Sequence, residues 1–277
     1  MNIKLIALDM DGTALTTEKT MLPETTRVLR AAAQRGIHIV PATGRVRKLI
    51  PQPILDVGSI RYAITANGAT VLDLEKDAVL YENLLTEEQS NRLIDYLMGC
   101  NVLVEAYTGG DSYVDKKHLE LIPTFKDYPQ IFIDMFLKYQ TPVDDLPNFL
   151  KKGKSRLEKI NIPYMEPDVR EMIWNKLSEK QEFALTSSFS NNIEINHASA
   201  NKGDGLRHLC ERLGIKPDEV IAFGDETNDL QMLKFAGCGV AMQNGCEEAK
   251  QAADFITLSN NEDGIPYALE KLAGIKA

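Results

Sequence analysis

The chain has 277 residues, of which 44% are hydrophobic and 26% are charged, and its formal net charge is −9. This length exceeds the usual size of one hydrophobic core, so we expect two domains, or one domain with a large insertion. The composition is that of an ordinary soluble globular protein, and no stretch approaches the roughly 18–20 apolar residues that cross a bilayer. The acidic balance argues against a nucleic-acid binder, which usually carries a basic face.

The N-terminal sequence and the cysteine spacing indicate the cellular compartment in which we expect the protein. The chain runs directly into a predicted strand, without the charged region, apolar region and cleavage site of a secretory signal, so we expect a cytoplasmic protein. The four cysteines show no C-x-x-C spacing; they are Cys100, Cys210, Cys238 and Cys246. Free thiols are therefore expected rather than a zinc site or disulfides.

The first 67 residues alternate strands with helices. An apolar run from Ile3 to Leu8, interrupted only by Lys4, predicts a buried strand of a parallel sheet, and it ends in Asp9, Asp11 and a Gly-Thr turn. The pattern then predicts a helix over 23–36, a strand over 37–40, a helix that ends near 55, a strand over 61–65, and a hairpin over 71–74 and 78–81. This alternation is typical of a doubly wound sheet.

The pattern changes near Leu84. It next predicts a helix over 86–98, strands over 102–107 and 112–114, a helix over 128–138, a strand over 157–162, a helix over 167–179, and strands over 183–188 and 193–196. The first alternation then resumes, with a helix opening at 200–203, strands over 219–223, 238–242 and 254–257, and helices from about 246 and 264. Because it resumes, the fold class that we expect is α/β: a doubly wound, Rossmann-like parallel-sheet core over residues 1–83 and 198–277, with an inserted α+β domain over residues 84–197.

Polar side chains follow several strands of the predicted core. They are Asp9 and Asp11, Thr43 and Gly44, Asn67, Lys202 at a helix start, and Asp225, Asn228 and Asp229. In open α/β sheets, ligands bind beyond the carboxyl ends of the strands, so these groups are expected to converge. Converging carboxylates repel one another unless a cation joins them, and Mg²⁺ prefers carboxylate oxygens, waters and phosphate. A hydroxyl, an ammonium group and a glycine loop suit phosphoryl oxygens, so the set predicts metal-assisted phosphoryl transfer.

Four segments resemble, in chain order, the four motifs of the haloacid dehalogenase superfamily. They are Asp9-x-Asp11-Gly12-Thr13, Thr43-Gly44-Arg45, Lys202-Gly203 and Gly224-Asp225-x-x-Asn228-Asp229. The insertion between the second and third motifs is similar to the C2 cap of the Cof-type phosphatase branch, and the Asn67-Gly68 turn also resembles that branch. Each motif alone is weak, whereas four in the right order at strand ends are highly specific.

The resemblance implies a Mg²⁺-dependent phosphatase that acts on small phosphorylated metabolites, such as sugar phosphates or nucleotides. It implies that Asp9 is the nucleophile that forms an aspartyl-phosphate, and that Asp11 is the general acid and then the general base. The phosphoryl group would be bound by Thr43, Gly44 and Lys202. Mg²⁺ would be held by Asp9, the main-chain carbonyl of Asp11 and Asp225, with Asn228 and Asp229 close by.

Some assignments stay open at this stage. Arg45 would either reach the substrate or pair with a core acid, and Asn67 would either contact the substrate or cap a turn. The alternative functions are a phosphotransferase, in particular a phosphomutase, and a non-catalytic sensor of phosphorylated metabolites. Binding alone needs neither Asp9 nor Asp11, which favours an enzyme. We expect no nucleic-acid or membrane partner, and a monomer or small homo-oligomer.

Overall fold

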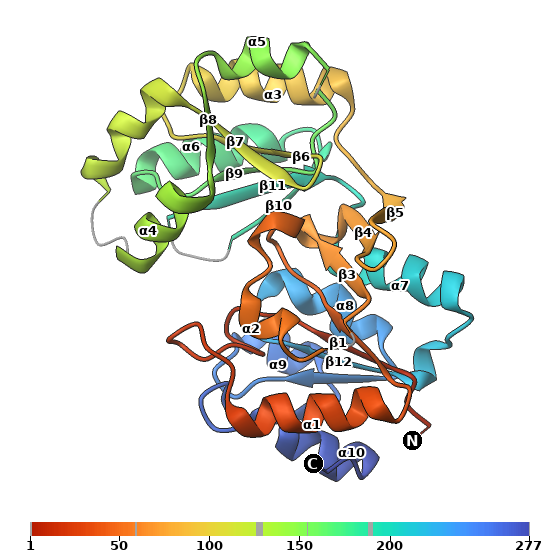
Figure 1. Ribbon diagram of the computed structural model, residues 1–277. Coiled ribbons are helices and arrows are strands. Elements are labelled where there is room, and N and C mark those ends of the chain that lie inside the picture. Colours follow the sequence, from red (N-terminus) through yellow and green to blue (C-terminus); the bar gives the residue numbers. More distant parts are fainter. Residues whose placement is uncertain (1, 59, 126–129, 154, 188–190, 277) are drawn as a thin grey trace. The chain divides into compact units, whose positions relative to one another are not determined.

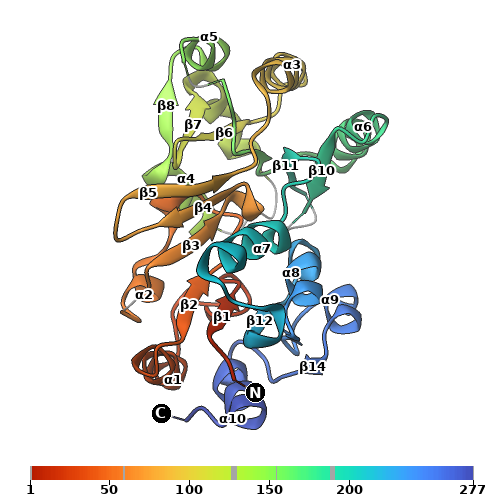
Figure 2. The same cartoon turned by 90° about the vertical axis from the view of Figure 1, so that its right-hand side faces the viewer.

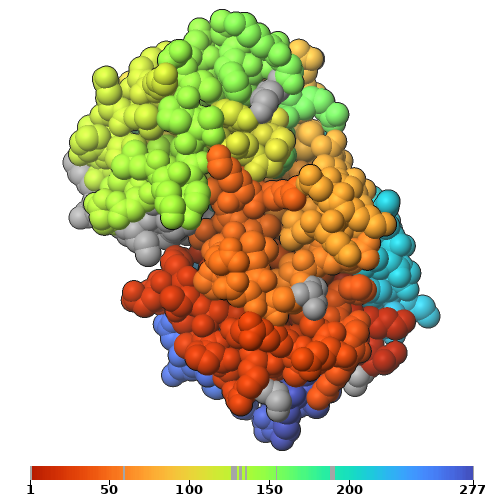
Figure 3. All heavy atoms as spheres, viewed as in Figure 1, coloured from red at the N-terminus to blue at the C-terminus, as the bar shows by residue number. Residues whose placement is uncertain are grey.

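The computed structural model describes residues 2–58, 60–125, 130–153, 155–187 and 191–276. The chain forms two compact units, which are considered separately below. The first unit comprises Met1–Arg45, Ile50–Glu82 and Asn201–Ala277, and the second comprises Val46–Leu49 and Asn83–Ala200. Both can be followed by colour in Figures 1 and 3.

A parallel sheet forms the centre of the first unit. Its strand order is β14-β13-β12-β1-β2, and every neighbouring pair is parallel. The strands are β1 (Leu5–Leu8), β2 (His38–Pro41), β12 (Val220–Gly224), β13 (Cys238–Ala241) and β14 (Phe255–Ile256). Their apolar runs leave β1, β12 and β13 buried on both faces, as a parallel sheet covered by helices requires.

An antiparallel sheet of three strands extends this arrangement. It consists of β3 (Tyr62–Thr65), β4 (Thr70–Asp73) and β5 (Ala78–Glu82). A parallel bridge between Ala42 and Ile64 places the end of β3 beside the end of β2. The carboxyl ends of β2 and β3 therefore lie side by side.

Helices cover both faces of the parallel sheet. They are α1 (Pro23–Gln34), α2 (Gln52–Leu55), α7 (Lys202–Leu213), α8 (Leu230–Phe235), α9 (Glu247–Ala252) and α10 (Gly264–Ala273). Alternate residues of β1 point to opposite faces: Ile6 and Leu8 join the core that contains α1 and α10, whereas Leu5 and Ala7 join the core that contains α7. Figure 2 shows α1 and α10 on one side of the strands and α7 and α8 on the other. The expected doubly wound sheet is confirmed.

The pattern predicted one helix ending near residue 55; its end is confirmed by α2, but a single continuous helix is wrong. Two short pieces, a 3-10 turn at Arg47–Leu49 and α2, stand in its place. Pro51 explains the break, because proline supplies no backbone N–H and disfavours the helical conformation of the residue before it, here Ile50; Pro53 lies in the first turn of α2, where proline is tolerated.

The second unit is a mixed α+β unit, as expected. Its sheet has the order β10-β11-β9-β6-β7-β8 and is antiparallel except between β7 and β8. The strands are β6 (Glu105–Thr108), β7 (Asp111–Asp115), β8 (Thr141–Val143), β9 (Lys159–Ile162), β10 (Phe183–Thr186) and β11 (Ile193–His197). The helices are α3 (Glu87–Met98), α4 (Gln130–Tyr139), α5 (Leu146–Lys151) and α6 (Pro167–Ser178), with a 3-10 segment at Lys116–Thr124. The pattern missed β8 and α5, and the ends predicted at 128–129 and 188 lie outside the described residues.

The two faces of this second sheet differ in polarity. Ala106, Ile160 and Ile195 pack into the apolar core that contains residues of α3, α5 and α6. The alternate residues of β6, β9 and β11 form a polar ladder on the other face: Glu105, Tyr107, Lys159, Asn161, Glu194 and Asn196. Within the ladder, the Lys159 ammonium group lies 3.2 Å from Glu194 Oε2 and 4.8 Å from the centre of the Tyr107 ring.

Within the described ranges, no helix combines the length and the apolar character that crossing a membrane requires.

Candidate functional site

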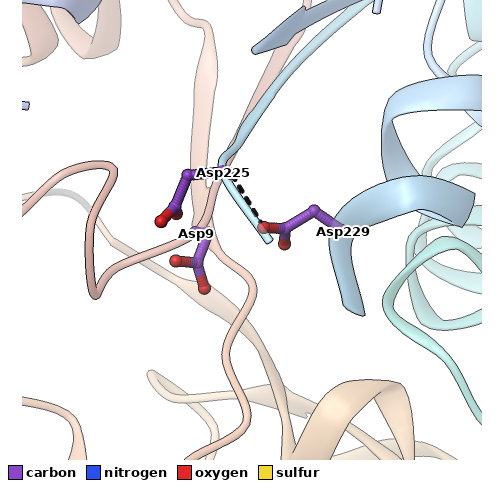
Figure 4. Close-up of side chains that lie close together, drawn as sticks. All are labelled: Asp9, Asp225 and Asp229. Atoms are coloured by element: carbon purple, nitrogen blue, oxygen red, sulfur yellow. Dashed lines mark hydrogen bonds between the residues drawn. The ribbon is translucent and has the colours of Figure 1, made fainter. Parts of the chain in front are cut away.

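Three strand exits of the first unit converge on one site. Asp9 directly follows β1 and Asp225 directly follows β12, while Thr43 stands two residues beyond β2. Since β1 lies between β12 and β2, the three residues come to one edge of the sheet. All three side chains are buried. Figure 4 shows the carboxylates of Asp9 and Asp225 close to that of Asp229.

Lys202, the first residue of α7, joins two of these acids. Its side chain is fully buried, and its Nζ donates to Asp9 Oδ1 at 2.5 Å and to Asp229 Oδ1 at 2.7 Å. Burial alone would lower the pKa of Lys202, but Asp229 and Asp9 raise it above its usual value. The lysine is therefore a permanent positive charge beside Asp9.

Asp229 also fixes the loop that carries Asp225. Its Oδ2 accepts hydrogen bonds from the main-chain N–H groups of Asp225 at 2.9 Å and Glu226 at 3.0 Å. Both of its carboxylate oxygens are thus engaged, one by the loop and one by Lys202. This geometry suits a residue that positions its neighbours.

The remaining acids carry more negative charge than Lys202 balances. Burial raises the pKa of Asp9 well above its usual value, and the charges of Asp229 and Asp225 add to this against the attraction of Lys202. Burial, and then Asp229, raise the pKa of Asp225 to about 7. A cation placed among these carboxylates would favour their ionised forms.

The available oxygens fit such a cation. One carboxylate oxygen from each of Asp9, Asp225 and Asp229 lies within 4.8 Å of the others. Asn228 Oδ1 is buried and has no hydrogen-bond partner among the described residues. Uncharged amide and anionic carboxylate oxygens are the ligands of hard divalent ions, so the site could hold one.

Gly12 and Thr13 shape the place of Asp225. Thr13 Oγ1 donates to Asp225 Oδ1 at 2.6 Å. Gly12 has a φ of +89°, and a Cβ on it would lie 2.1 Å from Asp225 Oδ2. Both residues stand in the first motif, although the sequence pattern indicated no separate role for either of them.

Asp11 is held by two cations. Arg45 donates through Nε to Oδ2 and through Nη2 to Oδ1, both at 2.8 Å, and Lys19 Nζ lies 2.9 Å from Oδ1. Burial would raise the pKa of Asp11, but Arg45 and Lys19 outweigh it and lower the pKa to about 2. Arg45 thus pairs with an acid, as one of its two expected roles required, and the acid is Asp11. Nothing in the sequence pattern indicated Lys19.

The loop after β2 is tied to the turn after β3. Thr43 Oγ1 accepts from the Arg45 N–H at 3.1 Å, with Gly44 between them, and the Thr43 carbonyl accepts from the Asn67 N–H at 2.9 Å. Asn67 Oδ1 in turn accepts from Asn228 Nδ2 at 3.2 Å. All the candidate site residues predicted from the sequence therefore lie in the first unit, near the carboxyl ends of its strands.

Comparison with known proteins agrees with this arrangement. Residues 6–269 match the model of a haloacid dehalogenase-like hydrolase family. The chain is 32% identical to the putative phosphatase YxeH of Bacillus subtilis over 97% of this chain and 98% of that protein. It is 31% identical to 5-amino-6-(5-phospho-D-ribitylamino)uracil phosphatase YitU of the same organism over 96% of each chain.

A solved structure shows the same fold. The structure of a haloacid dehalogenase-like hydrolase from B. subtilis superposes with a TM-score of 0.84 at 26% identity, covering 98% of this chain and 100% of that chain. The family match spans nearly the whole chain, and the relatives are named phosphatases, so the protein is a phosphoric monoester hydrolase. The chain belongs to the family of haloacid dehalogenase-like hydrolases, as the four motifs predicted, and to its Cof-type phosphatase branch, as the insertion and the Asn67-Gly68 turn predicted.

Proposed function

We propose that this phosphatase hydrolyses small, hydroxyl-rich phosphate esters in a Mg²⁺-dependent reaction, through an aspartyl-phosphate on Asp9. The contact between Lys202 Nζ and Asp9 Oδ1 carries this proposal. A buried lysine that keeps its charge holds one oxygen of Asp9 and supplies a positive charge where a phosphoryl group would arrive. Among the described residues, Lys202 is the only side chain that hydrogen-bonds the Asp9 carboxylate, so the second oxygen remains for attack.

The reaction takes place in two steps. Asp9 attacks phosphorus, the bond from phosphorus to the ester oxygen breaks, and Asp11 gives the departing oxygen a proton. Water then attacks the phosphorus of the aspartyl-phosphate, Asp11 takes a proton from that water, and inorganic phosphate leaves with Asp9 restored. Thr43, the Gly44 main chain and Lys202 would hold the phosphoryl oxygens during both steps.

Mg²⁺ would be held by Asp9, Asp225, the Asp11 main-chain carbonyl and Asn228 Oδ1. The orphaned Asn228 oxygen and the raised pKa values of Asp9 and Asp225 support this set. Bound there, the ion would offset the repulsion between the nucleophile and an anionic ester. Asp229 would remain on Lys202 and the loop.

Asp11 needs a proton before it can act as an acid. In this structure Arg45 and Lys19 keep it ionised, which suits its second task, the removal of a proton from water. A phosphate ester that draws these cations toward its own charge would raise the pKa of Asp11 and let it take up the proton that the leaving oxygen needs. The ion-paired state then returns when phosphate leaves.

The names of three relatives support a hydroxyl-rich organic part of the substrate. Three B. subtilis relatives, at 29%, 30% and 31% identity, are named 5-amino-6-(5-phospho-D-ribitylamino)uracil phosphatases, and their named substrate carries a ribityl chain. Sugar and alditol phosphates therefore come first in any panel of candidates.

The test is phosphate release from such a panel, with Mg²⁺ and with excess chelator. We expect release only with Mg²⁺, and we expect Asp9→Asn to lower kcat by at least about a thousandfold. Asp56→Asn, an exposed change in the same unit, should leave kcat unchanged. Full activity in Asp9→Asn would exclude the nucleophile assignment, and conversion of a hexose 1-phosphate to the 6-phosphate without free phosphate would favour the mutase alternative.

A further inference from the structure

The turn after β3 has an unusual backbone. Ala66, Asn67 and Gly68 are consecutive residues with φ values of +48°, +56° and +91°. Residues with a side chain rarely adopt this left-handed region, although asparagine tolerates it better than most. Such conformations persist only where the surrounding structure holds them, and they gather at functional sites.

The main chain of this turn holds the loop that carries Thr43. The Ala66 N–H donates to the Arg45 carbonyl at 2.8 Å, and the Asn67 N–H donates to the Thr43 carbonyl at 2.9 Å. Gly68 packs against the start of α7, where a Cβ would lie 2.0 Å from the Asn201 carbonyl oxygen and 2.9 Å from the Lys202 nitrogen. The turn therefore joins the second and third motifs.

The Asn67 side chain acts on the fourth motif. It is 3% exposed, and its Oδ1 accepts from Asn228 Nδ2 at 3.2 Å. Because the Asn228 amide group donates through Nδ2 to Asn67, its Oδ1 points away from Asn67. Asn228 Oδ1, buried and without a hydrogen-bond partner in the described part of the chain, is the oxygen left for a ligand.

We infer that Asn67 is a positioning residue for the cation site, and not a substrate contact. Its side chain sets the orientation of the Asn228 amide so that Oδ1 faces the ion, while its backbone holds the Thr43 loop. This inference rests on the proposed function for the identity of the ion. It excludes one of the two roles that the sequence left open for Asn67, the substrate contact, and adds a role that the sequence did not indicate.

Three variants separate the side chain from the backbone. Asn67→Gly removes the amide but adopts a positive φ without strain, whereas Asn67→Ala removes the amide and strains the turn. Asn67→Asp keeps the acceptor oxygen and tolerates the left-handed conformation. Mg²⁺ affinity is measured by calorimetry on the substrate-free protein, and KM and kcat are then measured at saturating Mg²⁺.

We expect Asn67→Gly to weaken Mg²⁺ binding about 10- to 100-fold, the usual effect of removing a partner of a metal ligand. At saturating Mg²⁺ its KM should stay within about threefold of the wild-type value, since no substrate contact is lost. Asn67→Asp should bind Mg²⁺ at least as tightly as the wild type. In an Asn228→Ala background, Asn67→Gly should cause no further loss, because the two changes remove one interaction.

Several outcomes would overturn the inference. Unchanged Mg²⁺ affinity with a raised KM in Asn67→Gly would make Asn67 a substrate contact. If Asn67→Gly and Asn228→Ala weakened Mg²⁺ binding independently in the double variant, Asn67 would not act through Asn228. If the wild-type protein bound no Mg²⁺, there would be no cation site for Asn67 to position. Mg²⁺ binding is measured without turnover and so does not depend on phosphatase activity. If Asn67→Gly lost Mg²⁺ affinity as expected but the wild-type protein released no phosphate, the proposed function would be refuted and the inference about Asn67 would stand.

Discussion

Gly12 is the residue on which the position of Asp225 depends most directly. Gly12→Ala would force an L-residue into a φ of +89° and place its Cβ 2.1 Å from Asp225 Oδ2. The carboxylate would have to move, because real Cβ atoms do not approach an oxygen so closely. We predict that Gly12→Ala weakens Mg²⁺ binding and lowers kcat, each by at least about tenfold.

Gly36→Ala is the matched control for this change. Gly36 has a φ of +82°, and no heavy atom lies within 4 Å of the Cβ that alanine would add. Both variants should lose about 1–2 kcal/mol of unfolding free energy through backbone strain, measured by thermal denaturation. Equal losses of activity in the two would show that strain, rather than the collision with Asp225, is responsible.

The single residues of the site were predictable to different degrees. Asp9, Thr43 and Asp225 were selected because each stands in a short motif at the end of a predicted strand, and Lys202 because its motif stands at the start of a predicted helix. Lys19 was not, since its approach to Asp11 depends on a turn in which its N–H bonds the Thr16 carbonyl at 2.9 Å. Pairing of this kind comes from the backbone path, which residue type and spacing do not encode.

Among the secondary-structure elements, β6 carries an acid whose ionisation opposes folding. Burial raises the pKa of Glu105 to about 7 from an ordinary value of 4.5, although Asn161 and Lys159 act against the rise. The folded state therefore binds the proton more tightly than the unfolded state. The stability gained from this bound proton is fully present below about pH 4.5 and is lost as the pH rises to about 7. At 1.36 kcal/mol for each pH unit, the loss in unfolding free energy is up to about 3 kcal/mol.

We predict that Glu105→Gln removes this pH dependence and makes the second unit more stable than the wild type at pH 8. The Gln140 and Asn161 amides donate to Glu105, and their own carbonyl oxygens have no hydrogen-bond partner among the described residues. Rotation of either amide would give the new N–H₂ group an acceptor. The variant should consequently retain the packing of the wild type.

Urea unfolding at pH 5 and pH 8, followed by fluorescence, measures the effect. The chain has one tryptophan, Trp174, which lies in α6 and so reports on the second unit. Glu88→Gln, on the same unit but with 89% of its side chain exposed, is the control and should leave the pH dependence unaltered. A wild-type protein that is equally stable at both pH values would contradict the raised pKa.

Elements with strong local signals were predicted well, and weak ones were not. The start of α3 was recognised because Thr86 and Gln89 form a capping box, which the structure contains. By contrast, β8 has three residues with Pro142 at its centre, and α5 has six residues. Segments this short are formed by packing against neighbours, which a local pattern does not contain.

At the scale of the whole molecule, the two units have separate hydrophobic cores. One buried cluster includes Leu93, Ile160 and Ile195 of the second unit, while the clusters of the first unit lie on either side of β1. The chain passes between the units near residues 45, 50, 82 and 200. An insertion was predictable from the interrupted strand–helix alternation. The grouping of Val46–Leu49 with the second unit was not, because it depends on contacts between residues distant in sequence. One of them is the hydrogen bond that the Lys48 N–H donates to the Gly110 carbonyl at 3.2 Å.

This division predicts that Mg²⁺ stabilises the units unequally. All the proposed ligands belong to the first unit, so at 100 times its dissociation constant the ion would add about 2.7 kcal/mol to that unit's unfolding free energy. Hydrogen exchange followed by mass spectrometry should show slower exchange in β1, β12 and α7 when Mg²⁺ is added, and little change in β9 and β11. Asp225→Asn, which removes one of the carboxylates, should greatly reduce the effect. Equal slowing in both units would contradict this unequal stabilisation, because the ion would then bind elsewhere or the two units would unfold together.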